Sequence, residues 1–208
     1  MNATVKITSP RAVKTGKSRL TAAGGRTGMA AGLCLVQLVL AYEWLLSGVN
    51  KLLNQNFTVQ LASTLHQNIS GNPYGWYVSL LRGVVLPHAN VFGVLTELGE
   101  LSIGVTLLAS AVLWMRFPAG RPTMYAGIAA CAALAGATFM PLNYFLMSGD
   151  PIPWINPANA FNEGVSIDVL MSLLAVALLV ANLNALKTAA GRLSGAGARA
   201  QGDTSWAA

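Results

Sequence analysis

The chain is poor in charge. Only 10% of its 208 residues are Asp, Glu, Lys or Arg, against about 25% in a typical soluble domain. Apolar residues make up 54% of the sequence, and its mean hydropathy is +0.53. This composition excludes an ordinary soluble globular domain. It predicts an all-α integral membrane protein whose main surroundings are the lipid bilayer.

Residues that bind metals or carry redox chemistry are also scarce, with two cysteines and two histidines in the whole chain. Cys34 and Cys131 lie in separate apolar runs without C-x-x-C spacing, so we interpret them as small buried hydrophobes. His66 and His88 lie in one expected loop, and the sequence has no H-x-x-x-H or E-x-x-H pattern. The sequence therefore predicts neither a metal site nor a haem held by membrane histidines.

The positive charge is distributed like a topology signal. The net charge is +6, and eleven of the 13 basic residues lie in residues 1–27, at positions 116 and 121, or after residue 186. Such clustering argues against nucleic acid as a partner. Because cytoplasmic loops of membrane proteins are enriched in Lys and Arg, we expect both termini in the cytoplasm and loops 54–90 and 148–160 on the outer side.

Four apolar runs are long enough to cross a bilayer, which takes about 20 residues per helix. They cover residues 28–53, 91–115, 123–147 and 161–186. We therefore expect a four-transmembrane-helix bundle over residues 28–187, with a basic tail at 1–27 and a disordered tail at 188–208. The third run is rich in Ala and Gly, which let helices approach closely, so it is expected at the centre of the packing.

The first outer loop has a pattern of its own. Phe57, Leu61 and Leu65 recur at helical spacing, which predicts a short helix on the membrane surface. Residues 76–86 are apolar but too short to span, so they are expected to be interfacial or re-entrant.

Most of the few acids lie where acids are least expected. The chain has seven, and Glu43, Glu97, Glu100 and Asp168 fall within the apolar runs. A charged side chain at the bilayer centre costs about 2.5–3.5 kcal/mol on insertion scales, and such residues usually face the bundle interior and serve a function. Glu97 and Glu100 share one helix face at i, i+3 spacing. These four acids are our candidates for proton exchange.

Other polar residues fall at a similar depth, towards the outer side. The candidates for binding substrate or quinone are Lys51, Arg82, Asn143, Trp154 and Glu163. With the four acids they predict a polar pocket in the outer half, while the inner half is expected to be almost purely Leu, Val and Ala. The alternative for these residues is structural, because polar side chains also hold membrane helices together.

Three stretches carry a resemblance to a known family. Residues 42–52, YEWLLSGVNKL, resemble the first-helix signature of the DoxX-like membrane proteins. Residues 143–168 are similar to the DoxD branch, the small subunit of thiosulfate:quinone oxidoreductase, and residues 97–101, ELGEL, with Gly104, resemble the second helix of the family. The resemblance extends over about residues 28–187 in order and spacing.

The resemblance implies a four-helix protein of the plasma (inner) membrane that takes part in oxidising thiosulfate to tetrathionate, with quinone as electron acceptor. It also implies a DoxA-like second subunit, which this chain does not contain. The alternative is a non-catalytic membrane anchor or assembly subunit for another membrane or extracytoplasmic protein. A homo-oligomer is compatible with either function. A transporter is disfavoured by the apolar inner half.

Overall fold

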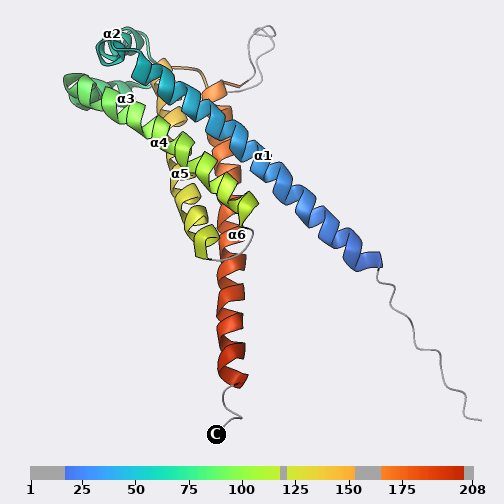
Figure 1. Cartoon of the computed structure of the whole chain (residues 1–208). Helices are drawn as coiled ribbons and strands as arrows, with labels where there is room; N and C mark the ends of the chain where they lie inside the picture. The colour runs from blue at the N-terminus through green and yellow to red at the C-terminus, as the bar shows by residue number, and fades with distance from the viewer. Residues whose placement is uncertain (1–16, 118–120, 153–164, 204–208) are drawn as a thin grey trace, which may run out of the picture.

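The computed structural model describes residues 17–117, 121–152 and 165–203, and these ranges are all-helical, without a strand. Six α-helices follow in order: α1 (Lys17–Leu53), α2 (Phe57–Ile69), α3 (Gly75–Leu80), α4 (Ala89–Arg116), α5 (Arg121–Ser148) and α6 (Ile167–Asp203). A π turn, η1 (Leu81–Val85), and a 3-10 turn, η2 (Leu86–His88), join α3 to α4. Figure 1 shows the long helices as one bundle with α2 and α3 at one end.

Four helical segments are long and apolar enough to cross a membrane: Ala31–Leu53, Gly75–Arg116, Pro122–Ser148 and Ile167–Gly191. The predicted all-helical class and the number of candidate spans are therefore confirmed. The second segment is longer than predicted because α3, the two turns and α4 follow one another directly, although the backbone of His88 departs from α-helical values just before α4.

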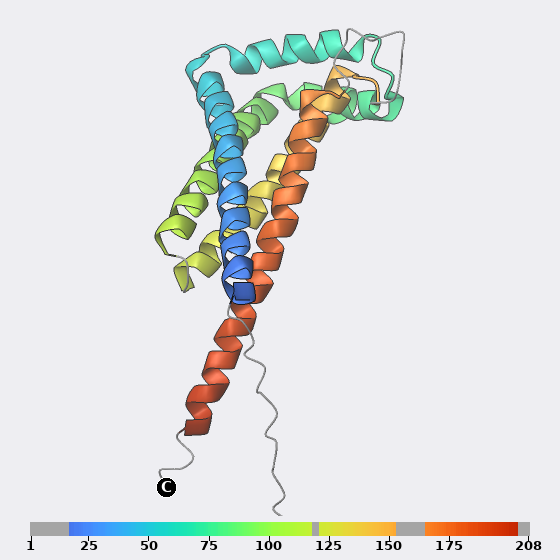
Figure 2. The ribbon, with the colours of Figure 1, turned by 90° about the vertical axis from the view of Figure 1, so that its right-hand side faces the viewer.

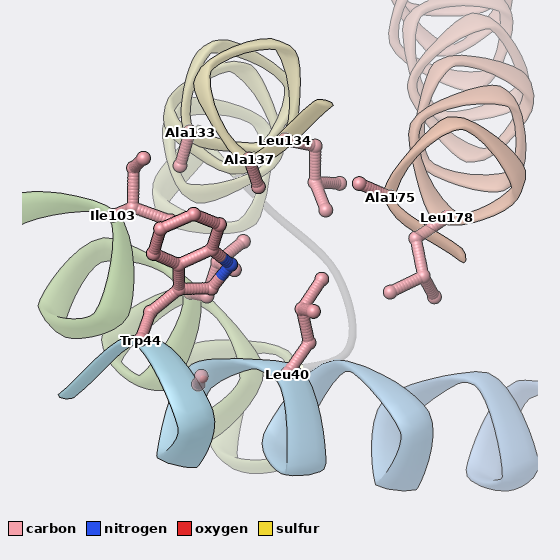
Figure 3. Packing of buried hydrophobic residues seen from close by; sticks show 10 residues of the cluster. Leu40, Trp44, Ile103, Ala133, Leu134, Ala137, Ala175 and Leu178 are labelled. Atoms are coloured by element: carbon pink, nitrogen blue, oxygen red, sulfur yellow. The ribbon is translucent and has the colours of Figure 1, made fainter. Parts of the chain in front are cut away.

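The bundle is held by a core to which four helices contribute. α1 packs on α4, α4 on α5, and α5 on α6, so α5 lies between two neighbours as its small residues led us to expect. In the core, Leu40 and Trp44 of α1 face α5 and α6 (Figure 3). The residues opposite them are mostly small or of medium size: Ala133, Leu134, Ala137, Ala175 and Leu178.

Glycine brings α1 and α4 close together. A Cβ atom added at Gly48 would lie 2.7 Å from the backbone nitrogen of Leu101, and one added at Gly104 would lie 2.7 Å from that of Leu45. Small residues at membrane-helix contacts allow such an approach of one backbone to another. The two glycines therefore fix the contact between α1 and α4, with Gly48 against Leu101 and Gly104 against Leu45.

The helix expected from Phe57, Leu61 and Leu65 is α2, which runs across the end of the bundle (Figure 2). It shares a second apolar cluster with α3 and the start of α4, in which Leu65 and Leu81 are almost fully buried. The segment 76–86 is helical as well. It continues through the π turn η1 into the 3-10 turn η2, which contains Pro87, and Pro87 lacks the N–H that a regular helix would need.

The helix ends differ from prediction at both ends of the chain. α1 begins at Lys17, earlier than the expected residue 28. Residues 165 and 166 are not helical, so the fourth long helix begins at Ile167 and not at residue 161. α6 continues to Asp203, which corrects the expectation of a disordered tail for residues 188–203. Alanine is frequent there, and alanine has the highest helix propensity.

Candidate functional site

A buried ion pair joins α1 to α4. Lys51, in the last turn of α1, places its Nζ 2.6 Å from Glu100 Oε2. The Glu100 side chain is fully buried, whereas the Lys51 side chain is 22% exposed. The Glu100 carboxylate therefore lies inside the bundle, and the Lys51 ammonium neutralises its charge.

A third helix completes the arrangement. The Tyr144 hydroxyl of α5 donates a hydrogen bond to Glu100 Oε1 at 2.5 Å, so each carboxylate oxygen has one donor. Lys51 Nζ also donates to Ser47 Oγ at 2.7 Å. The same ammonium lies 5.7 Å from the centre of the Phe57 ring and 5.9 Å from that of Tyr144, within the range of cation–π attraction. We call Lys51, Glu100 and Tyr144 the ion-pair cluster.

Local sequence explains why the ion-pair cluster forms. Ser47 and Lys51 are one helical turn apart, so they share a face of α1. Gly48 lies between them and brings that face against Leu101, the residue next to Glu100. The Glu100 side chain therefore lies in a close helix contact that excludes water from it, and it pairs with Lys51 there.

The hydrogen-bond donors of the ion-pair cluster are of types that could bind the carbonyl oxygens of a quinone headgroup. A quinone carbonyl oxygen accepts hydrogen bonds, and the ion-pair cluster contains a phenol and an ammonium that can donate them. A carboxylate joined to a phenol by a short hydrogen bond can also pass a proton to it or receive one.

The predicted acids do not gather in one place. Glu43 is exposed on a flank of α1, and Glu97 is half-buried on α4. Within the described ranges neither of them makes a hydrogen bond or an ion pair. Asp168 lies in the first turn of α6, because that helix begins later than expected, and it is half-buried. On this part of α1, Ser47 and Lys51 are half-buried, whereas Glu43 and Asn50 are exposed.

The predicted binding residues are divided between the ion-pair cluster and the end of the bundle at which α2 and α3 lie. Asn143 Oδ1 accepts a hydrogen bond from the Tyr77 hydroxyl at 3.1 Å, which ties α3 to α5. Arg82 is exposed on η1 and has no salt-bridge partner in the described part of the chain. Trp154 and Glu163 lie outside the described residues.

The C-terminal end of α5 is capped by the loop before α3. Asn72 Nδ2 donates to the carbonyls of Leu146 and Met147 at 2.9 and 3.1 Å, and the Tyr74 hydroxyl donates to the Asp150 carbonyl at 2.6 Å. These bonds satisfy carbonyls that the end of a helix leaves without partners. An apolar depression lies at this end of the bundle, lined by Pro73, Tyr74, Pro151 and Ile152.

Sequence reasoning missed Tyr144 and a second polar cluster. Gln37 Nε2 donates to Ser110 Oγ at 2.9 Å, and Asn182 Nδ2 donates to Gln37 Oε1 at 3.3 Å, with all three residues buried. The expectation of an inner half without polar groups is therefore wrong. The signal was present in the sequence, because Gln37 and Asn182 are lone amides within Leu- and Val-rich runs.

Within the described ranges, no group of three or more His, Cys, Asp or Glu side chains is placed to hold a metal ion. Comparison with protein families, with curated proteins and with solved structures finds no match to this chain.

Proposed function

We propose that this chain is the membrane subunit of a quinone-linked oxidoreductase and that the ion-pair cluster exchanges protons with the quinone. The observation that supports this proposal most is the fully buried Glu100 carboxylate, which is bonded to an ammonium from α1 and a phenol from α5. Lys51, Glu100 and Tyr144 all fall within the three stretches that resemble the DoxX-like family. The proposed location is the plasma membrane, with both termini in the cytoplasm.

The proposed reaction is balanced by the proton chemistry of this cluster. Two thiosulfate ions joined by a new S–S bond give one tetrathionate and release two electrons. A quinone that accepts two electrons must also take up two protons to become a quinol. In our proposal Tyr144 and Lys51 each pass one proton to the quinone as it takes up two electrons. Two protons from water then restore the phenol and the ammonium, and the Glu100 carboxylate relays the proton that returns to Tyr144. Oxidation of thiosulfate would also need the DoxA-like second subunit.

The test is thiosulfate-dependent quinone reduction in membranes that contain this chain with candidate second subunits. We expect Glu100→Gln and Tyr144→Phe to lower the rate by about 100-fold or more, which is the usual contribution of a positioned acid or base. Tyr125→Phe is the matched control, because Tyr125 is 64% exposed on the same helix, and its rate should be unchanged.

Two outcomes would contradict the redox proposal. One is the absence of thiosulfate-dependent reduction with every candidate subunit. The other is full activity in both Glu100→Gln and Tyr144→Phe at normal protein levels, which would show that the ion-pair cluster takes no part in the reaction.

One observation favours a second function, that of a non-catalytic anchor for a partner protein. Lys51 and Glu100 satisfy each other and join α1 to α4, while Tyr144 adds α5, as a purely structural contact would. For an anchor, Tyr144→Phe should lower the stability of the chain but leave the activity of the assembled complex unchanged. For a redox subunit, activity should fall more than stability does.

A further inference from the structure

The first candidate span carries an acid that no described residue of its own chain contacts through a hydrogen bond or an ion pair. Glu43 lies near the middle of the Ala31–Leu53 segment and is exposed. It makes no hydrogen bond or ion pair with any residue that the structure describes. Ionisable residues in membrane spans are rare and almost always face protein or a water-filled cavity. We therefore expect Glu43 to make a polar contact with another chain at the same depth in the membrane.

The adjoining face of α1 has the spacing of a helix-packing surface. Six large apolar side chains there are exposed and recur with alternating spacings of four and three residues, as the a and d positions of a coiled coil do. We call them the outer stripe of α1: Leu35, Val39, Tyr42, Leu46, Val49 and Leu53, which are 39–76% exposed. Gly32 continues the spacing, and a Cβ atom added there would have no atom within 4 Å.

The donor that Glu43 lacks lies on the same stripe. Tyr42 is 63% exposed, and its hydroxyl has no hydrogen-bond partner within the described ranges. A phenol can donate to a carboxylate, but neighbouring residues on one helix point in directions too different for them to bond each other. Donor and acceptor therefore complement each other between two copies of this surface.

The charge distribution specifies how two copies would meet. Eleven of the 13 basic residues are placed to give every copy the same orientation, so the α1 helices of two copies run parallel. In a parallel pair, equal residues lie at equal depth, and a side chain at d packs beside the following e residue of the other helix. With Tyr42 at d, the residue at e is the partner's Glu43.

We propose that the outer stripe of α1 is the interface of a homodimer, in which the Tyr42 hydroxyl of each copy donates to the partner's Glu43. The occupant is a second copy of this chain, because the surface carries both halves of the hydrogen bond and a two-fold axis forms that bond twice. The inference does not rest on the redox function, since it uses none of the residues of the ion-pair cluster.

Disulfide cross-linking of the full chain in native membranes tests the interface. Cys34→Ala and Cys131→Ala first remove the native thiols. We expect Val39→Cys and Leu46→Cys to give a covalent dimer on mild oxidation. Val105→Cys is the control, because Val105 is 51% exposed on α4 and lies away from the outer stripe. No covalent dimer from the stripe, or equal yields from all three positions, would overturn the proposal.

The hydrogen bond is tested by dilution of labelled full-length protein in vesicles of fixed lipid composition, with energy transfer as the readout. Glu43→Leu and Tyr42→Phe should each raise the dissociation constant about tenfold, because each removes both symmetry-related bonds. Glu43→Gln, which still accepts a hydrogen bond, should bind more tightly than Glu43→Leu. An unchanged dissociation constant in both Glu43→Leu and Tyr42→Phe would show that these residues form no contact between copies.

Discussion

At the scale of single residues, the stability of the bundle depends on the partners of Glu100. A buried ion pair gains little over a well-packed apolar pair, because both charges lose their hydration. Removal of only one partner is far more costly, since the remaining charge stays buried without compensation. Glu100 is fully buried, and both of its oxygens are used, so it is the residue at which such a loss should be largest.

We therefore expect Lys51→Met to lower the free energy of unfolding by about 3–5 kcal/mol. The double variant Lys51→Met/Glu100→Leu should recover most of this loss, because neither charge then remains. Lys187→Met is the control: Lys187 is exposed, and its loss should change stability by less than about 0.5 kcal/mol. Reversible unfolding in mixed micelles measures all three. A double variant no more stable than Lys51→Met alone would argue against the ion pair as the cause.

The sequence predicted this pair only in part. Glu100 was a candidate for proton exchange and Lys51 a candidate for binding substrate or quinone, but their pairing was not predicted. What could not be read was which acid turns inward, since Glu97 and Glu100 share one face at i, i+3 spacing. The choice is made by Gly48 and Gly104, which bring α1 against one side of α4. That contact depends on two helices at once, and a pattern within one helix does not contain it.

At the scale of helices, the contact between α1 and α4 is set by glycine. A side chain at Gly48 would meet the backbone of Leu101, which cannot move aside as a flexible side chain can. The helices would have to separate, and the distance between Lys51 and Glu100 would grow with them. The geometry of the ion-pair cluster is thus a property of the helix contact as much as of its own residues.

Gly48→Ala should therefore destabilise the bundle by about 1–3 kcal/mol, which is the usual cost of overpacking. Gly191→Ala in α6 should be neutral or stabilising, because a Cβ atom there would have no atom within 4 Å and alanine favours helix. The comparison uses thermal unfolding of the two variants under the same conditions. If Gly48→Ala proved as stable as Gly191→Ala, the close approach of α1 and α4 would be refuted.

Helix positions were more predictable than helix ends. The long apolar runs of α4 and α5 gave ends within a few residues of those observed, because charge or proline bounds them. α6 was shifted at both ends, since the acids before Ile167 and the alanines after Leu186 give no sharp signal. Gln37 and Asn182 were overlooked because each is an isolated polar residue in an apolar run. Their significance appears only when the partner on the other helix is known.

At the scale of the whole molecule, four candidate spans place both ends of the chain on one side of a membrane. α2 and the turn before α3 then lie on the opposite side (Figure 2). The ion-pair cluster lies near that face, because Lys51 is in the last turn of α1. In the proposed orientation the chain ends lie in the cytoplasm, as the distribution of the basic residues predicts.

This topology predicts which thiols a membrane-impermeant maleimide can reach. With the native cysteines replaced by alanine, Ser63→Cys on α2 should react in intact cells, because Ser63 is exposed on the outer end. Thr188→Cys on α6 should react only after permeabilisation, and Leu107→Cys, in the buried core, should react in neither case. Labelling of Thr188→Cys in intact cells would reverse the assigned orientation.

The Lys51–Glu100 bond also bears on the order in which the chain enters the membrane. Both residues belong to the first two candidate spans, so they can meet before α5 and α6 have been synthesised. If α1 and α4 insert together as a hairpin, each charge enters lipid already neutralised by the other, and neither helix must cross alone with a bare ion. Tyr144 joins them only when α5 follows. Each of these two spans carries one charge that would be costly to insert into lipid alone. The ion pair thus allows them to enter the bilayer as one unit.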